Sequence, residues 1–205
     1  MVSDEAHFWM SGYVNKQNYR FWGSEQPKII VTTSMKPKRI TVWCAISCNG
    51  IIGPYFFEEN VNSEAYCRML ADFFIPMAYG LNKVDKYWLI QDGAAPHRTC
   101  EVFQLLHEHF PGRVISLGYS NRFGLGIDWP PYSPDLNCCD FYLWGALKDA
   151  VYRESPRTTG ELKEKIKNAI EHIPSRTLID VKSDFNARLE ACVTAKGDQF
   201  EQYIL

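Results

Sequence analysis

The sequence has no surplus of basic residues and no long apolar run. Its 22 Lys and Arg residues are outnumbered by 24 Asp and Glu residues, and the net charge is −2. Proteins that bind nucleic acid through their overall charge are usually basic, so any affinity for DNA must come from local patches or from a further module. No apolar run approaches the roughly 18 to 20 residues needed to cross a bilayer, and we therefore expect no membrane partner.

A regular cysteine framework is also missing. The cysteines number seven, which is odd; Cys138 and Cys139 are adjacent, while Cys44 and Cys48 lie in an apparent strand. Neither pair has the usual spacing of a zinc loop, so we expect reduced, partly buried thiols in an intracellular protein. What the sequence does have is aromatic bulk. Its 6 Trp, 11 Tyr and 12 Phe among 205 residues can supply the core of one sizeable domain.

The order of the predicted elements indicates an α/β protein with a mixed sheet flanked by helices. Asn49-Gly50 between two apolar stretches predicts a hairpin turn, and Ser63 is a plausible helix N-cap. The glycine-rich stretch Gly118–Asp128 is expected to be an irregular loop. Periodicity and turn residues predict strands at 4–10, 19–22, 40–47, 51–57, 87–92 and 113–117, and helices at 62–80, 99–110, 141–152, 161–173 and 176–195.

The stretch SPRTTG at 155–160 is the clearest linker in the chain. Two amphipathic helices are predicted beyond it. We therefore expect one main domain over residues 1–154 and a helical extension over 155–205 that packs on it.

The stretch WLIQDGAAPHRT carries the first candidate site residue, because an apolar strand ends there on Asp92. The nearest basic residue in sequence is Arg98. An unpaired buried carboxylate costs several kcal/mol or changes its pKa, so Asp92 needs a cation. We interpret it as a metal ligand.

Asp140 is the second unusual carboxylate. If Asn137 caps the following helix, Asp140 falls in its first turn, where the helix dipole favours an acid. Asp140 also shares a helical stripe with Leu136, Leu143 and Trp144, which predicts that it faces the interior, where a metal would explain it. Taken alone, the spacing favours the capping role.

Asp4 is the third candidate, and it is interpreted as a site residue only together with Asp92 and Asp140. On a strand, Asp4 lies on the same side as Ala6 and Phe8, and Glu5 lies on the opposite side. Alone, Asp4 would be interpreted as a surface acid near a chain end. Three carboxylates on two strands and a helix could, however, hold two Mg²⁺ or Mn²⁺ ions, because hard cations prefer oxygen ligands.

Four stretches in this order resemble the catalytic domain of mariner-type transposases in the DDE/DDD superfamily: SDEAHFWMSGYVNKQNYRFW, VWCAISCNGIIGPYFF, WLIQDGAAPH and WPPYSPDLNCCDFYLWG. The resemblance implies an RNase H-like (retroviral integrase-like) fold with C-terminal helices and a catalytic, metal-binding triad. The triad falls on Asp4, Asp92 and Asp140. A five-residue step puts Asp135 on a different helix face from Asp140, which favours Asp140 as the third acid.

The resemblance extends to other residues less specifically. His97 ends the second acid motif, and the family implies a place near the metals without direct ligation; a hydrogen-bonded loop histidine is the alternative. Several basic residues could contact DNA phosphates, although a solvated surface explains each equally well. They are Lys36, Lys38, Arg39, Arg98, Arg113 and Arg122.

The chain departs from the family pattern in two ways. Family members carry a helix-turn-helix region that reads transposon ends, and the sequence before Asp4 has no room for one. The segment between Asp92 and Asp140 is longer than usual in the family. The excess is most simply placed in Gly118–Asp128.

The leading functional hypothesis is DNA strand cleavage and strand transfer at transposon ends, with DNA as partner. The resemblance implies a homodimer for the full-length protein and a location in the nucleus. Metal-activated water would hydrolyse a phosphodiester, and the freed 3′-hydroxyl would attack target DNA. A catalytically inactive remnant or a domesticated interaction module is the alternative, and a structure-selective nuclease is a third. The retained acids favour the enzyme, whereas the missing reader region and the near-neutral charge favour the remnant.

Overall fold

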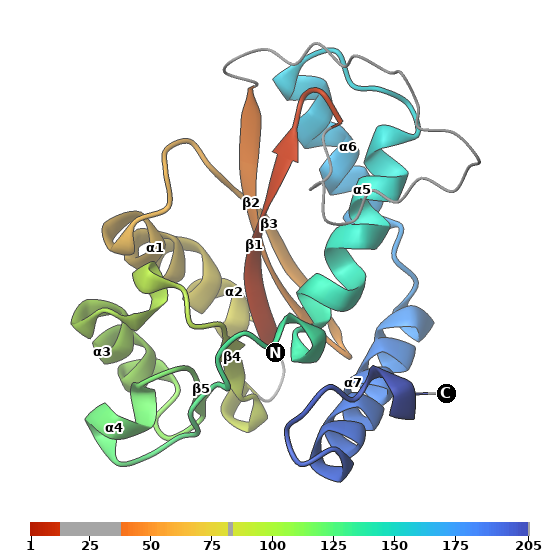
Figure 1. Cartoon of the computed structure of the whole chain (residues 1–205). Coiled ribbons are helices and arrows are strands. Elements are labelled where there is room, and N and C mark those ends of the chain that lie inside the picture. Colours follow the sequence, from red (N-terminus) through yellow and green to blue (C-terminus); the bar gives the residue numbers. More distant parts are fainter. Residues whose placement is uncertain (13–37, 82–83, 205) are drawn as a thin grey trace.

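The computed structural model describes residues 1–12, 38–81 and 84–204 (Figure 1). The strand predicted at 19–22 and Lys36 lie outside these residues. Within them, the strands form one five-stranded mixed sheet in the order β3-β2-β1-β4-β5. The predicted mixed sheet is therefore confirmed.

The strands divide into an antiparallel half and a parallel half. β1 (Val2–Trp9), β2 (Arg39–Ser47) and β3 (Gly50–Phe57) form an antiparallel meander. On the other side of β1 lie β4 (Leu89–Gln91) and β5 (Val114–Ile115), both parallel to it. β1 is thus the central strand, and its neighbour β4 runs in the same direction.

The β2–β3 hairpin forms at the predicted place with a different turn. Ser47 pairs with Gly50, so the two central residues are Cys48 and Asn49 rather than Asn49 and Gly50. The Ser47 hydroxyl donates to the Gly50 carbonyl at 3.0 Å and accepts from the Asn49 amide at 3.3 Å. These local hydrogen bonds hold the turn one residue earlier than the Asn-Gly signal predicts.

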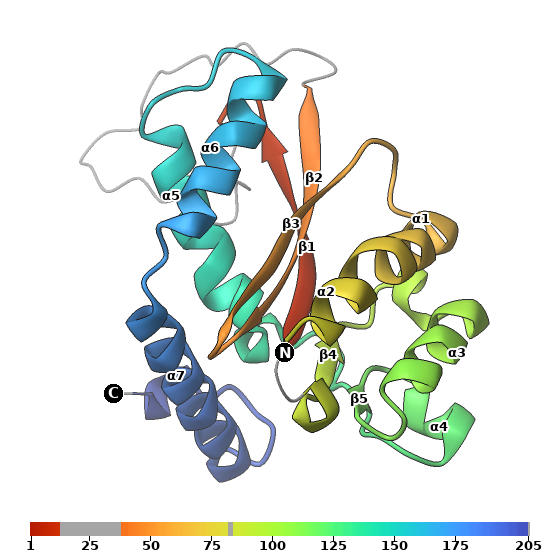
Figure 2. The ribbon, with the colours of Figure 1, turned by 180° about the vertical axis from the view of Figure 1, so that it is seen from behind.

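Helices cover both faces of the sheet, in two groups that the two opposite views separate clearly (Figures 1 and 2). The first group comprises α1 (Ser63–Met69), α2 (Ile75–Tyr79), α3 (Cys100–His109) and α4 (Tyr119–Phe123). The second comprises α5 (Trp144–Tyr152), α6 (Thr159–Glu171) and α7 (Ser175–Thr194). Short 3-10 turns occupy Val84–Lys86, Ala95–Arg98, Pro134–Leu136 and Glu201–Tyr203.

The helix predicted at 62–80 is continuous but changes its winding in the middle. A π-helical turn at Leu70–Phe74 joins α1 to α2. Pro76 follows directly, and since proline has no amide hydrogen, the ordinary α-helical ladder cannot continue through it. Asn62, not Ser63, caps the start: its side-chain oxygen accepts from the Ala65 amide at 2.8 Å.

The predicted irregular loop Gly118–Asp128 contains a short helix, so that prediction is wrong in part. α4 begins after Gly118 and ends before Gly124, and both glycines have positive φ, at 86° and 64°. Asp128 Oδ1 accepts hydrogen bonds from the amides of Gly118 and Ser120 and from the Ser120 hydroxyl. One side chain therefore ties together the ends of the segment, which composition alone does not reveal.

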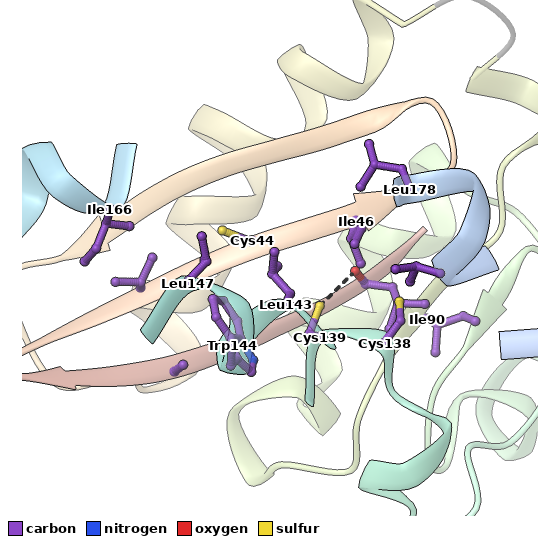
Figure 3. Close-up of a cluster of buried hydrophobic side chains, with 14 of the residues drawn as sticks. Cys44, Ile46, Ile90, Cys138, Cys139, Leu143, Trp144, Leu147, Ile166 and Leu178 are labelled. Atoms are coloured by element: carbon purple, nitrogen blue, oxygen red, sulfur yellow. Dashed lines mark hydrogen bonds between the residues drawn. The ribbon is translucent and has the colours of Figure 1, made fainter. Parts of the chain in front are cut away.

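Two hydrophobic cores lie on the two faces of the sheet. β2 serves both: Cys44 and Ile46 belong to the core under α5, α6 and α7, whereas Trp43 and Ala45 belong to the core under α1 and α3. Figure 3 shows part of the first core, where Trp144 and Leu147 of α5, and Leu143 directly before α5, meet Cys44 and Ile46 of β2. A strand buried on both faces reads as a nearly continuous apolar run, as RITVWCAIS does.

The C-terminal helices share this core with the sheet. Leu162 and Ile166 of α6, and Leu178 and Val181 of α7, are buried in the same cluster as Val2 of β1. α6 and α7 begin and end close to the predicted residues. Across the described residues, no helix is long and apolar enough to cross a membrane.

Candidate active site at the edge of the central strands

The three candidate acids come from three elements that meet beside β1. Ser3 of β1 pairs with Gln91, the last residue of the parallel strand β4, so Asp4 is the next residue of β1 and Asp92 is the first residue after β4. Asp140 lies in a π-helical turn at Cys139–Leu143, directly before α5, and this turn packs against β1 and β2. Residues far apart in the sequence thus converge at one region.

Asp4 is buried inside the layer between β1 and α5. The residue is 8% exposed, and its Oδ2 accepts a hydrogen bond from the Trp144 indole nitrogen at 2.8 Å. Burial raises the pKa of Asp4 well above its usual value, and the charges of Asp140 and Glu5 raise it further. Among the described residues, no lysine, arginine or histidine forms an ion pair with Asp4.

Asp92 is held in the turn that follows β4. Its Oδ1 accepts from the Ala94 amide at 3.0 Å and lies 2.7 Å from His97 Nδ1. Burial alone would raise the pKa of Asp92, but the close contact with His97 and its positive charge outweigh it, and the pKa is lowered. The sequence predicts that Asp92 needs a cation and assigns this role to a metal. In the structure, His97 supplies part of this positive charge.

His97 is enclosed between two carboxylates. It is 1% exposed, with Nδ1 beside Asp92 and Nε2 3.1 Å from Glu5 Oε2. Burial acts to lower the pKa of His97, but the charges of Glu5 and Asp92 prevail and raise it to about 10. The imidazole is therefore positively charged at neutral pH, and it links the Asp92 turn to the central strand β1.

A fully buried hydrogen-bond network holds the turn that carries Asp92 and His97 in place. Gln91 Nε2 donates to the His97 carbonyl at 2.9 Å and to the Ser116 hydroxyl at 3.0 Å. Gln91 Oε1 accepts from the Tyr66 hydroxyl at 3.0 Å, and the Tyr66 ring stacks on His97 with centroids 4.2 Å apart. Strands β4 and β5, helix α1 and the loop after Asp92 are thereby fixed to one another.

Of the two predictions made for the helix start around Asp140, the cap is correct and the direction that Asp140 faces is wrong. Asn137 is indeed the cap, since its Oδ1 accepts from the Cys139 amide at 3.0 Å. Asp140 is exposed, however, and does not face the interior as the stripe predicted. The reason is the π-helical turn, whose wider winding breaks the i, i+4 spacing that relates Asp140 to Trp144.

The pKa of Asp140 nevertheless indicates that its carboxyl group lies near the other acids. Partial burial of its carboxyl group and the charge of Asp92 raise its pKa to about 6. Asp135, the competing aspartate of the same motif, is half-buried in the 3-10 turn before Asn137, and its backbone carbonyl accepts from Arg188 at 3.2 Å.

Two residues near the acids were not singled out by the sequence. Glu5 lies on the opposite side of β1 from Asp4, as alternation predicts, and its carboxylate contacts His97. Lys148 of α5 is partly buried over the Phe8 ring, with the ammonium 5.8 Å from the ring centroid. Burial lowers the pKa of Lys148, while the charges of Asp140 and Asp4 raise it. Its position two helical turns after Asp140 was the available signal.

The basic residues considered for DNA contact divide into engaged and available side chains. Arg39 donates to Asn60 at 3.4 Å and lies over Trp9, and Arg113 donates to the Tyr87 carbonyl at 2.7 Å. Lys38 is exposed. Arg98 and Arg122 are exposed and line one groove, described below.

The three acids fit a hard divalent cation by their chemistry. They are oxygen donors, and burial together with the charges of neighbouring acids raises the pKa values of Asp4 and Asp140. In the described part of the chain, no three acid, histidine or cysteine groups already stand close enough together to hold a metal. The donor set is therefore suitable, and a cation would have to draw the carboxylates together.

A family model and a curated relative match most of the chain. The sequence profile of the family described as "DDE superfamily endonuclease" matches residues 1–163. Tc3 transposase of Caenorhabditis elegans is 24% identical over 200 residues, which cover 97% of this chain and 56% of the relative. The chain therefore spans little more than half the length of the curated relative that it matches.

Solved structures of a second transposase share the fold. The Mos1 mariner paired-end complex with Mn has a TM-score of 0.74 at 18% identity, covering 98% of this chain and 56% of that one. The catalytic domain of Mos1 mariner transposase has a TM-score of 0.64 at 16% identity and covers 98% of this chain and 84% of that one. The predicted RNase H-like fold is thereby confirmed.

Proposed function

The chain belongs to the DDE superfamily endonuclease family, and from this premise we propose that it is the catalytic part of a mariner-type transposase. The reaction proposed is metal-dependent cleavage of a DNA strand followed by strand transfer at transposon ends. The observation that carries the proposal is that Asp4 of β1, Asp92 after β4 and Asp140 before α5 lie in one region. There the charges of Asp140 and Asp92 help to raise the pKa of Asp4, and the charge of Asp92 helps to raise that of Asp140.

In this proposal Asp4, Asp92 and Asp140 are the catalytic residues and hold two Mg²⁺ or Mn²⁺ ions. When bound, a pair of such ions lowers the pKa of an attacking water or hydroxyl and stabilises the oxygen that leaves phosphorus. Oxygen ligands without cysteine suit these hard cations. The Mos1 paired-end complex has been solved with Mn and with Mg, which supports the choice of metals.

The surrounding residues orient the three acids. The Trp144 indole holds Asp4 Oδ2 toward the α5 layer. The Ala94 amide and His97 hold Asp92, and His97 acts beside the metals rather than as a ligand because both of its ring nitrogens already face carboxylates. Asn137 starts the helix that carries Asp140. Lys148 adds a positive charge near Asp140 and Asp4.

The chain spans about half of the length of its curated relative, so the properties of the whole relative are only proposed here. We propose that this protein recognises transposon ends and target DNA, acts as a homodimer and works in the nucleus. Within this chain, residues 1–154 would form the catalytic domain and 155–205 the helical extension on it. The shared core of α6, α7 and β1 supports the packing of the two parts.

A non-catalytic role, as a remnant or a domesticated interaction module, is the second candidate. It is favoured by one observation, namely that the described residues contain no ready-formed group of three metal ligands. The two candidates differ in what a metal does to the protein. Only the enzyme requires that Mg²⁺ or Mn²⁺ bind at the three acids.

Thermal unfolding with and without metal separates the candidates. If the acids bind Mn²⁺ or Mg²⁺, the metal raises the melting temperature by linkage, and Asp92→Asn removes that rise. Asp149→Asn is the matched control, because Asp149 is an exposed aspartate on α5 away from the acids. A melting temperature of the unaltered chain that no metal changes would favour the remnant.

The identity of the third acid is tested by DNA nicking. Asp140→Asn should remove Mn²⁺-dependent nicking of supercoiled DNA, because the amide lacks the charge of a ligand while keeping its volume. Asp135→Asn should reduce nicking modestly through the geometry of the loop before Asn137. Circular dichroism controls for folding. Normal nicking by Asp140→Asn together with an inactive Asp135→Asn would assign the third position to Asp135.

A further inference from the structure

A groove of about 420 Å³ lies beside the loop that follows Asp92. It is lined by Arg98, Phe103, Leu117, Gly118 and Arg122. These residues come from the turn after β4, from α3, from the end of β5 and from α4. The figures place α3, α4 and β5 together at one end of the molecule, away from α7 (Figures 1 and 2).

The groove adjoins the candidate active site directly. Arg98 lies in the same turn as His97, and its positive charge is one of the causes that lower the pKa of Asp92. Gly93, the residue after Asp92, packs on the wall of the groove: a Cβ at this position would lie 2.9 Å from Leu117 Cδ2. The groove therefore lies next to the turn that carries Asp92.

The two arginines are held differently, and both are exposed. Arg122 is oriented, since its Nη1 donates to Cys100 Sγ at 2.9 Å and its guanidinium lies 5.8 Å from the Phe123 ring centroid. Arg98 is exposed and makes no hydrogen bond or ion pair with any described residue. Neither guanidinium is neutralised by a carboxylate within the described ranges.

The segment that carries Arg122 is held in shape by its own contacts. Asp128 Oδ1 fixes Gly118 and Ser120 at the start of α4, and the left-handed Gly124 ends the helix. This is the stretch to which the sequence assigns the excess length between Asp92 and Asp140. These contacts order the wall of the groove that carries Arg122.

We propose that this groove binds the backbone of one DNA strand next to the phosphate that reacts, with a neighbouring phosphate between Arg98 and Arg122. The inference rests on the proposed function, because it extends the DNA path from the acids. Guanidinium groups bind phosphate through paired hydrogen bonds, and the half-buried Leu117 side chain offers apolar surface for a sugar or a base.

Size and charge agree with this occupant. Pockets of roughly 300 to 1,000 Å³ hold single small ligands, so a groove of about 420 Å³ suits a nucleotide of one strand rather than a duplex. The chain as a whole has a net charge of −2 and would repel DNA. A local pair of arginines beside the acids supplies the attraction that the overall charge does not.

The test measures binding of fluorescent oligonucleotides, single-stranded and duplex, by anisotropy in EDTA over a series of salt concentrations. Arg98→Gln and Arg122→Gln should each weaken binding of the single strand without sequence preference. Each should also reduce the slope of log affinity against log salt by about one, as expected for one lost phosphate contact. Arg176→Gln is the control, because Arg176 is an exposed arginine at the start of α7.

The outcomes separate this inference from the proposed function. An unchanged slope in both variants, or a change confined to the duplex, overturns the single-strand groove even if Asp92→Asn abolishes metal-dependent nicking. A reduced slope in a chain that never nicks DNA supports the groove and contradicts the enzyme. Melting curves control for folding, and Arg98→Gln carries the test alone if Arg122→Gln is unstable, since Arg98 has no partner among the described residues.

Discussion

The two ends of the candidate site are built in opposite ways. Around Asp92, the Ala94 amide, His97 and the buried Gln91 fix the carboxylate and the turn that carries it. Around Asp140, the helix cap holds the backbone, while the side chain is exposed at a π-helical turn. Asp92 has a lowered pKa, and Asp140 has a raised one.

The contrast indicates that the sheet side of the site is preorganised and the helix side is not. A carboxylate with its own cationic neighbour is stable before any metal arrives, whereas Asp140 gains most from an added cation. This difference explains why, before a metal binds, the three acids do not stand close enough together to hold one. Substitutions on the sheet side, around Asp92, should therefore affect stability differently from substitutions on the helix side, around Asp140.

The largest effect is expected from the buried network under Asp92. Gln91→Leu removes three hydrogen bonds and leaves the Tyr66 hydroxyl, the Ser116 hydroxyl and the His97 carbonyl without this partner. Buried polar groups without partners cost about 1 to 3 kcal/mol each, so we expect a loss of about 3 kcal/mol in the free energy of unfolding. Urea unfolding measures it, with the exposed Gln104→Leu as control; a loss equal to the control would contradict the network's role.

A smaller loss is expected where Asp4 meets the helix layer. Trp144→Phe removes the indole N–H that donates to Asp4 Oδ2 inside a buried layer. We expect a loss of about 1 to 2 kcal/mol, for a hydrogen bond to a buried carboxyl group together with some packing. Because the variant also frees Asp4, it should weaken the metal-induced rise in melting temperature. Urea unfolding and metal titration together check both expectations, and full retention of the metal effect would exclude an orienting role for Trp144.

Asp92→Asn and Asp140→Asn should change the stability of the protein in opposite directions. In the absence of metal, Asp92→Asn loses the ionic contact with His97 and should lower the melting temperature modestly, since 39% of the Asp92 side chain is exposed and water screens the pair. Asp140→Asn removes a charge that its neighbours disfavour and should raise the melting temperature slightly. Shifts of the same sign in both variants would mean that the two ends of the site do not differ.

The pH dependence of Asp140→Asn sharpens this comparison and is the smallest effect. The pKa of Asp140 rises from 3.8 in the unfolded chain to about 6 in the folded one. Between these values the folded state binds more protons, so stability of the unaltered chain falls as the pH rises through this window. The advantage of Asp140→Asn should therefore be absent below pH 3.8 and complete above a pH of about 6. Melting curves over this range check it, and an advantage that is constant with pH would exclude the charge as its cause.

Several features could be predicted from the sequence because they depend on local chemistry. Asn137 was identified as a cap from its place before a helix, and it caps. β2 was predicted from an apolar run, and α6 and α7 from their periodicity. Asp92 was singled out because a carboxylate at the end of a buried strand requires compensation. Each of these inferences needs only neighbours along the chain.

The sequence by itself determined which residues are acids and where most of the strands and helices lie, although it missed α4 and placed the β2–β3 turn one residue too late. Only the tertiary structure decided which groups meet. His97 and Glu5 are distant in sequence, yet their contact makes the compensation of Asp92 partly internal. Asp140 is exposed because the π-helical turn changes the face that it occupies. Long-range pairing and irregular winding depend on packing between layers, and no local pattern encodes them.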